Sequence, residues 1–352
     1  MSSTEQHIYN GVRQGTVCCF GEVLLRYSPA LEGKWIRDTS MAVYIGGAEL
    51  NAATALAGWG LPVKYITALP DNYLSQEIVA EVEQKKIDTS AIIKRGERIG
   101  AYYLPQGADL KHAGVIYDRA YSAFAGLKPD MINWKEVLKD CGWFHFSAIS
   151  PALNADVAAV CLEAVQTAQS MGLTISVDLN YRAKLWQYGV SPAAVMPELV
   201  SYCDVVMGNC WAAESLLGVI SPIKESAGLS EEELVHAAMN SMRDMKLRFP
   251  QVKQMAYTFR LADTYWAVYQ DEGRFKRSLT FPIGKVVDKV GSGDCFMGGI
   301  IYGMQQQLLP QHLINFAAAA AVGKLHEAGD ATSQTVASVE KRLAEMQTAS
   351  AQ

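Results

Sequence analysis

The sequence predicts a doubly wound α/β fold, in which helices cover both faces of a mainly parallel β-sheet. Short apolar runs typical of buried strands alternate with helix-length periodic segments along most of the chain. This alternation indicates βαβ units, whose crossovers make neighbouring strands parallel. The expected strands are residues 16–20, 63–67, 143–146, 174–178, 205–207 and 254–258. The expected helices are residues 73–84, 154–171, 231–247, 293–307 and 311–327, with one more that continues through Ala57.

Two stretches depart from that alternation. Residues 23–45 and 95–125 are rich in Tyr, Val and Ile, contain turn residues and show no helical period. They indicate a small β appendage that could lie over a cleft, although separate hairpins on the main sheet would give the same pattern. In an open α/β sheet, ligands bind beyond the carboxyl ends of the strands. We therefore look for function in the loops that follow the strands.

The composition argues against several classes of partner. The 352-residue chain has a net charge of −5, and its Lys and Arg residues form no basic stripe, so we expect no nucleic acid or membrane partner. Residues 1–15 contain no apolar segment, and the apolar run 316–322 is too short to span a bilayer. The seven cysteines form no CxxC pair and favour buried thiols in a reducing compartment. We expect a cytoplasmic protein.

The run Asp288–Gly299 leads from small residues straight into a predicted helix. Backbone N–H groups at a helix start are unpaired and the helix dipole is positive there, so Gly291, Ser292 and Gly293 could cradle a phosphoryl group. Asp294 would stand at the reacting centre, where a carboxylate can accept the proton of an attacking hydroxyl. The run therefore predicts a catalytic anion site. A glycine turn with Asp294 as the helix N-cap is the alternative.

A second run, Gly46-Gly47, opens the helix that contains Asn51. Paired glycines let a ligand lie directly against the backbone, and an Asn side chain can both donate hydrogen bonds to sugar hydroxyls and accept them. We therefore interpret Gly46, Gly47 and Asn51 as substrate-binding residues. A simple turn before a helix would show the same residues.

The two runs, in this order and with strand–helix alternation between them, resemble the signature regions of the ribokinase-like (PfkB) carbohydrate kinase family. The similarity covers residues 16–342, so we expect one kinase domain with terminal extensions at 1–15 and 343–352. The resemblance implies a three-layer αβα fold whose small β-sheet lid is formed by about 23–45 and 95–125. It also implies that ATP is the phosphoryl donor and that Mg²⁺ accompanies it.

A third run, Asp178–Trp186, resembles a segment typical of the family's 2-keto-3-deoxygluconate kinases. In that subgroup an arginine, here Arg182, meets the acid end of the substrate. A guanidinium can bind a carboxylate through two parallel hydrogen bonds, which a neutral sugar cannot match. The resemblance thus implies a sugar-acid substrate. A surface arginine after a strand is the alternative.

The lid segments support the same subgroup, because Tyr102, Tyr117 and Arg119 resemble its paired tyrosines and arginine. The resemblance implies that these three residues contact the sugar acid. Either Tyr102 or Tyr103 could face the substrate. Aromatic residues that alternate in a β hairpin also serve packing alone.

On the nucleotide side, the resemblance places phosphate contacts at Asn209, Thr258 and Arg260, together with Gly291 and Gly293. Each of the first three follows or ends a predicted strand, at the edge of the sheet where ligands are expected.

Metal binding is where the chain departs from the family pattern. Many members carry an Asn-x-x-Glu element that helps to organise magnesium, but here Ala212 stands at the acidic position and Glu214 follows two residues later. Two residues turn a helix by about 200°, so Glu214 is not expected to substitute. Asp288 is a possible ligand, because magnesium often takes few protein ligands.

The implied reaction is the transfer of a phosphoryl group from ATP to the terminal O6 of 2-keto-3-deoxygluconate. Asp294 would be the general base, and the backbone of Gly291–Gly293 the anion hole. Alternatives are a kinase for another sugar acid or a neutral ketose such as fructose, and a catalytically silent sugar- or nucleotide-binding protein on the same fold. A nicotinamide-dependent dehydrogenase is disfavoured, because no G-x-G-x-x-G follows the first strand. The exposed edges of a β lid also predict a homo-oligomer formed through the lid.

Overall fold

The structure is a computed structural model that describes residues 9, 12–30, 35–37, 40–105, 114–221, 223 and 228–350. Its main sheet has ten strands in the order β15-β14-β13-β12-β11-β10-β1-β4-β6, with β16 paired to β14. The strands from β13 to β6 in this order are parallel, whereas β14, β15 and β16 are antiparallel additions at one edge. The expected mainly parallel, doubly wound sheet is confirmed.

All six expected strands and all six expected helices are present. The strands of the main sheet are β1 (Thr16–Phe20), β4 (Val63–Ile66), β6 (Ile87–Asp88), β10 (Cys141–Ser147), β11 (Thr174–Asp178), β12 (Val205–Gly208), β13 (Gln254–Arg260), β14 (Thr264–Asp271), β15 (Arg274–Arg277) and β16 (Phe281–Pro282). The helices are α1 (Ala48–Gly58), α2 (Tyr73–Gln84), α3 (Trp134–Val137), α4 (Ala155–Ser170), α5 (Pro192–Val200), α6 (Cys210–Leu217), α7 (Glu231–Arg248), α8 (Ser292–Gln305), α9 (Pro310–Leu325) and α10 (Val336–Ser350). Helix α10 runs across the expected domain boundary at residue 342, and its Leu343 is buried in the core.

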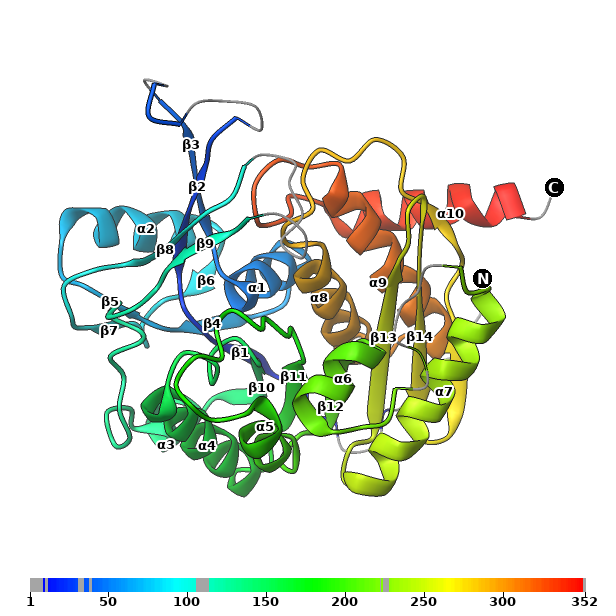
Figure 1. Cartoon of the computed structure of the whole chain (residues 1–352), viewed down its shortest axis with the longest axis horizontal. Helices are drawn as coiled ribbons and strands as arrows, with labels where there is room; N and C mark the ends of the chain where they lie inside the picture. Colours follow the sequence, from blue (N-terminus) through cyan, green and yellow to red (C-terminus); the bar gives the residue numbers. More distant parts are fainter. Residues whose placement is uncertain are drawn as a thin grey trace.

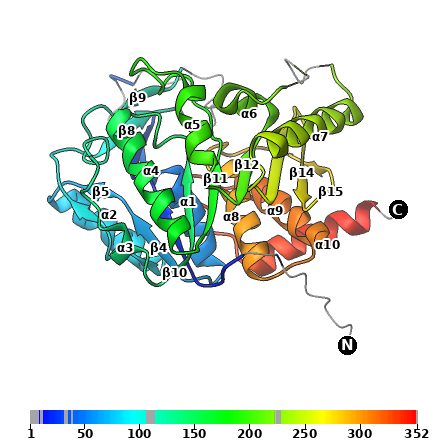
Figure 2. The same cartoon turned by 90° about the horizontal axis from the view of Figure 1, so that it is seen from below.

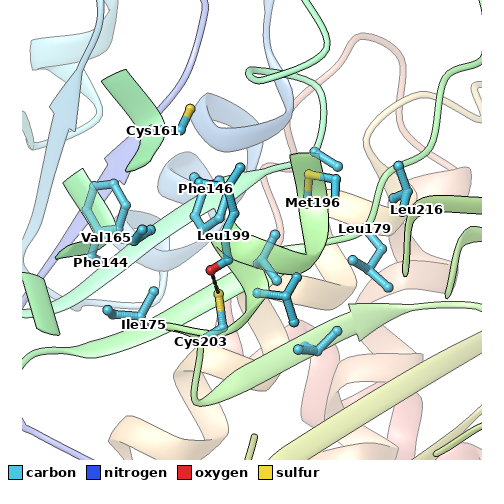
Figure 3. Packing of buried hydrophobic residues seen from close by; sticks show 14 of the residues in the cluster. Phe144, Phe146, Cys161, Val165, Ile175, Leu179, Met196, Leu199, Cys203 and Leu216 are labelled. Atoms are coloured by element: carbon cyan, nitrogen blue, oxygen red, sulfur yellow. Dashed lines mark hydrogen bonds between the residues drawn. The ribbon is translucent and has the colours of Figure 1, made fainter. Parts of the chain in front are cut away.

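Two helix layers enclose the main sheet. Helices α3 to α7 contribute to one apolar core, and α1, α2, α8, α9 and α10 to the other. Figure 2 shows strands β12 and β14 between α7 on one side and α8 to α10 on the other. Figure 3 shows part of the first core, to which Phe144 and Phe146 of β10 and Met196 and Leu199 of α5 all contribute. The molecule thus has the three layers that the sequence resemblance implied.

A second, four-stranded sheet forms the lid, in the order β3-β2-β8-β9. It combines β2 (Leu24–Ser28) and β3 (Ala42–Gly46) with β8 (Gly100–Tyr103) and β9 (Ile116–Asp118). The two stretches that broke the strand–helix alternation therefore pair with each other, as expected, rather than with the main sheet. Figure 1 shows these blue and cyan strands together near α1. A small two-stranded sheet joins β5 (Ala68–Leu69) to β7 (Ile93–Lys94) nearby.

The seven cysteines are all buried and none forms a disulfide. No helix within the described ranges is both long enough and apolar enough to cross a membrane.

Candidate active site

A cleft of about 1010 Å³ lies at the carboxyl ends of the parallel strands, under the lid. Its walls include the ends of β11, β12 and β13, the starts of α1 and α8, and residues of lid strands β8 and β9. Ligand pockets commonly occupy about 300–1,000 Å³, so this cleft has room for two substrates side by side. It lies where open α/β sheets bind ligands.

The start of α8 forms a turn that opens to this cleft. Gly291 is the N-cap, with φ of 80°, and a Cβ there would lie 1.7 Å from the carbonyl oxygen of Asp330. A Cβ on Gly293 would meet no atom within 4 Å, so the backbone is accessible there. The hydroxyl of Ser292 donates to the carbonyl of Ala321 at 3.0 Å and anchors the turn to α9. Unpaired N–H groups and the positive helix end make the turn suitable for a phosphate.

Asp294 follows this turn and lines the cleft, although only 8% of its surface is exposed. It accepts a hydrogen bond of 2.7 Å from Nδ2 of Asn51 in α1. Because Gly291 is the N-cap, the alternative role of Asp294 as a cap is not observed. Burial raises the pKa of Asp294 to about 7, against the opposing effects of the Asn51 hydrogen bond and the Arg182 charge. A base with that pKa is matched to work at neutral pH.

Asn51 keeps one polar atom for a ligand. Its Oδ1 is buried and meets no hydrogen-bond donor among the described residues. Buried polar atoms without partners are uncommon in folded proteins, and a sugar hydroxyl would satisfy this one. Asn51 can thus hold Asp294 with its amide nitrogen and a substrate with its oxygen.

The loop after β11 brings Arg182 into the cleft beside Asp178. Burial raises the pKa of Asp178 to about 8, with the nearby Asp294 as the next cause and Arg182 opposing both. The Arg182 guanidinium donates to the carbonyl of Tyr181 at 3.0 Å. Arg182 is therefore a cation within electrostatic reach of both carboxyl groups. Asp178 belongs to the run used in the sequence analysis, but it had not been assigned to the site.

Lid strands β8 and β9 supply the residues that cover this region. Tyr102 lines the cleft, whereas Tyr103 points the other way and stacks on Tyr27 at 5.1 Å between ring centroids. Of the two tyrosines that the sequence left open, Tyr102 thus faces the cleft. Tyr117 and Arg119 also line it.

The polar groups of the lid are tied to buried carboxylates. The Tyr102 hydroxyl donates to Asp330 Oδ2 at 2.7 Å, and Arg119 donates from Nε to Glu22 Oε2 at 2.6 Å. Asp330 lines the cleft as well, although no specific contact had been assigned to it from the sequence. Arg119 thus lines the cleft with its charge already paired.

The two glycines of the first run have different positions. Gly47 lines the cleft with φ of 137°, and a Cβ there would lie 2.3 Å from the Glu22 carbonyl oxygen. Gly46 is not among the lining residues, and a Cβ on it would lie 2.1 Å from Asp330 Oδ2. Gly46 therefore allows close packing behind the wall, while Gly47 forms part of the wall.

The expected nucleotide-side residues Asn209, Thr258 and Arg260 all line the cleft. Asn209 is the N-cap of α6, where its Oδ1 accepts from the Ala212 N–H at 2.9 Å. Lys289 also lines the cleft, immediately before the α8 turn, and adds a cation there that had not been assigned to the site.

Metal ligands are few in this cleft. No three His, Cys, Asp or Glu side chains gather into a metal site within the described part of the chain. Asp288 lies behind the wall, where Arg26 donates to it at 2.5 Å, and Glu214 does not line the cleft. Cleft-lining carboxylates are limited to Asp178, Asp294 and Asp330 among the described residues. This set suits a magnesium ion held mainly by phosphate oxygens, with one or two carboxylates.

A glycine turn at a helix start, a buried carboxyl group beside it and a lid over the cleft form an arrangement that suits an enzyme of phosphoryl transfer. Residues 14–336 match the sequence profile of the pfkB family of carbohydrate kinases. The chain belongs to that family.

Several known proteins are similar to this chain in structure or in sequence. The 2-dehydro-3-deoxygluconokinase of Thermotoga maritima is similar in structure, with a TM-score of 0.84 and 31% identity over 94% of this chain and 99% of that one. The 2-dehydro-3-deoxygalactonokinase of Haloferax volcanii is 35% identical over 168 residues, 47% of this chain and 52% of that protein, so the match spans about half of the relative. A probable fructokinase of Arabidopsis thaliana is 25% identical over 83% of this chain and 82% of its own length.

Proposed function

We propose that this carbohydrate kinase transfers the γ-phosphoryl group of ATP to O6 of 2-keto-3-deoxygluconate, which is the compound also called 2-dehydro-3-deoxygluconate. The observation that carries the proposal is the presence of Arg182 in the same cleft as Asp294. Arg182 offers a planar cation for a carboxylate, and Asp294 offers a base for a hydroxyl at the other end of the sugar acid. The Thermotoga maritima relative supports this substrate by its name.

The chain's own residues divide the work of the reaction. Asn51 would position the substrate with its unpaired Oδ1 and hold Asp294 with its Nδ2. As O6 bonds to the γ-phosphorus, its proton passes to Asp294, and the bond to the bridging oxygen of ADP breaks. Backbone N–H groups of Gly291–Gly293 stabilise the charge that develops on the transferred group. The lid, through Tyr102 and Tyr117, would exclude water and favour transfer to the sugar over hydrolysis.

The nucleotide would lie on the other side of the α8 turn. Asn209, Thr258 and Arg260 line the cleft, and the proposal gives them the phosphates of ATP. Magnesium bound to ATP would neutralise phosphate charge, and Asp178 or Asp330 are the carboxylates within the cleft that could meet it.

The names of two relatives support two other substrates. The Haloferax volcanii protein is named for the galactonate epimer of the same sugar acid, and the Arabidopsis thaliana protein for fructose. Membership of a kinase family and the presence of Asp294 favour all three kinases over a silent binding protein. Arg182 favours either sugar acid over fructose, because a neutral ketose has no carboxylate to pair with it.

The proposal is tested by ADP release from Mg-ATP with 2-keto-3-deoxygluconate, its galactonate epimer, fructose, ribose and gluconate. We expect turnover with one or both keto-deoxy acids and little with the others. Fructose as the best substrate would refute the sugar-acid assignment. A protein that binds ATP but turns over none of the five would contradict the proposed function as a whole.

The proposal also includes a homo-oligomer formed through the lid and a cytoplasmic location. Strands β3 and β9 are the edges of the lid sheet, and both expose apolar side chains: Val43 is 51% exposed and Ile116 is 52% exposed. Exposed strand edges of this kind can pair with a second copy. Light scattering of the wild type and of Val43→Lys would show whether a dimer exists and whether it depends on the lid.

A further inference from the structure

Arg26 is a fully buried arginine on the lid, and it is not among the residues that line the cleft. It lies in β2, and its guanidinium contacts two carboxylates, Asp288 at 2.5 Å and Asp330 at 2.7 Å. The same group lies 4.5 Å above the ring of Tyr44 on the neighbouring strand β3. Burying a charge is costly unless it is paired, so this arrangement must be maintained as a unit.

Both carboxylates flank the turn at the start of α8. Asp288 precedes it, and its Oδ1 accepts from the Val290 N–H at 3.1 Å. Asp330 packs on the turn from the other side, because its carbonyl oxygen occupies the space that a side chain on Gly291 would need. One arginine on the lid therefore holds both sides of the turn that would bind the transferred phosphoryl group.

A second set of contacts lies on the face of the lid sheet that carries Arg26. Tyr44, Arg26 and Tyr102 are paired across β3, β2 and β8, so their side chains lie on one face of the lid sheet. Tyr102 donates to the second oxygen of Asp330 at 2.7 Å. Val290 packs into an apolar cluster with the lid residues Leu24, Tyr102, Leu104 and Val115. The lid and the turn thus form one connected body through charge, hydrogen bonds and apolar contact.

We propose that Arg26 is a positioning residue for phosphoryl transfer: it clamps the lid to the α8 turn and so sets the geometry of the Gly291–Gly293 backbone. Arg26 touches neither the cleft nor the reacting atoms, and it acts through Asp288 and Asp330. Without the clamp, the turn loses its alignment and the lid no longer excludes water. The kinetic part of this inference rests on the proposed kinase reaction, whereas its structural part does not.

The test compares Arg26→Met and Arg26→Lys with Arg274→Met. Arg274 pairs with the buried Asp271 at 2.7 Å on the antiparallel strands β14 and β15, so its removal also leaves a buried carboxylate without its cation. It is therefore a control for lost stability without any contact to the lid.

We expect Arg26→Met to lower kcat about 100-fold, because small misplacements of reacting groups cost about that much. The KM for the sugar acid should change by less than about threefold, since Arg26 does not contact it. A lid that is no longer clamped would admit water, so a larger share of the ATP consumed should be hydrolysed instead of transferred to the sugar. Arg26→Lys keeps the charge and should recover part of kcat. Arg274→Met should leave all three quantities within about twofold of the wild type, because Arg274 lies on β15 and does not line the cleft.

Hydrogen exchange provides a readout that needs no substrate. The amides of Val290 and Cys295 donate within the turn, to Asp288 Oδ1 and to the Gly291 carbonyl. In Arg26→Met these amides and those of β2 should exchange at least about tenfold faster than in the wild type, and in Arg274→Met they should not. If Arg26→Met fails to fold, the same amides can be compared in Arg26→Lys and in Tyr102→Phe, which removes only one hydroxyl. Their exchange rates should increase less than in Arg26→Met.

If the turn amides exchange at the same rate in the Arg26 variants as in the wild type, Arg26 does not position the turn and the proposal is refuted. An unchanged kcat in Arg26→Met would also refute it. A wild-type protein that phosphorylates none of the sugars would refute the proposed function, yet the exchange comparison would still decide whether Arg26 couples the lid to the turn.

Discussion

The two glycine turns of the cleft look alike in sequence, but the space around them differs. At the first turn, a Cβ on Gly46 would lie 2.1 Å from the Asp330 carboxylate. At the second, a Cβ on Gly291 would lie 1.7 Å from the Asp330 carbonyl, whereas one on Gly293 would meet nothing within 4 Å. Both turns therefore pack on the same residue, but only the second contains a glycine, Gly293, at which an added Cβ would meet no atom. A glycine motif can thus reflect packing or ligand approach, and the surrounding atoms tell which.

The largest effect is expected where the open turn ends, at Asp294. Asp294→Asn keeps the shape of the side chain but cannot accept a proton, and removal of a general base typically costs about 10²–10⁴-fold in rate. We therefore expect kcat to fall about 1,000-fold, as measured by ADP release with the best substrate of the panel. Loss of less than about tenfold would show that another group is the base.

The same variant should be at least as stable as the wild type at neutral pH. Burial raises the pKa of Asp294 from 3.8 to about 7, so the folded protein retains a proton that the unfolded chain releases in that range. The stability contributed by this group is therefore highest at low pH and falls as pH rises towards 7. Asn cannot ionise, so urea unfolding at pH 7 should show no loss of stability for Asp294→Asn.

Substitutions within the second turn would test the comparison directly. Gly291→Ala combines a positive φ with a contact against backbone, so we expect it to lose about 3 kcal/mol of unfolding free energy as well as activity. Gly293→Val points into open space and should cost less than about 1 kcal/mol. It should still lower kcat/KM for ATP about 100-fold, because the side chain would block the anion turn. Similar stability losses in both variants would break the distinction between the two glycines.

A smaller effect is expected from pH. Since the pKa of Asp294 is about 7, the active, deprotonated base is progressively lost as pH falls through neutrality. We expect kcat/KM for the sugar acid to drop about tenfold for each pH unit below about 6.5, whereas an ordinary Asp would stay active to about pH 4. The measurement is kcat/KM from about pH 5 to about pH 9, because this ratio reports the pKa of the enzyme without substrate. A flat profile down to about pH 5 would contradict the assigned base.

Much of this fold could be predicted from the sequence, because apolar runs and helical periods are local signals. The antiparallel edge was missed, although β14 and β15 are joined by a two-residue turn in which Glu272 and Gly273 both have positive φ. Asp-Glu-Gly-Arg at this turn is a hairpin signal that could have located both strands. The pairing of β2 with β8 joins segments far apart in the chain, and only the absence of helical period pointed to it.

The residues of the candidate site also differ in whether a local sequence pattern predicted them. Residues within motifs, such as Asp294, Asn51 and Arg182, were identified and do line one cleft. The ion pair between Asp330 and the buried Arg26 was not predicted, because it joins residues that lie about three hundred positions apart. Such contacts leave no local pattern, so the charge network behind the two turns could be seen only in the structure.

The most direct test of the proposed substrate class compares kcat/KM for 2-keto-3-deoxygluconate with that for fructose, in the wild type and in Arg182→Ala. If Arg182 pairs with the substrate carboxylate, the wild type should have the higher kcat/KM for the acid. In Arg182→Ala the kcat/KM for the acid should fall about 100-fold, because a charged hydrogen-bonded pair contributes about 3 kcal/mol. Its activity on fructose should stay within about threefold at about pH 9, where Asp294 is deprotonated even without the Arg182 charge that lowers its pKa. Equal losses on both sugars, or an unchanged preference for the acid in the variant, would contradict the role given to Arg182.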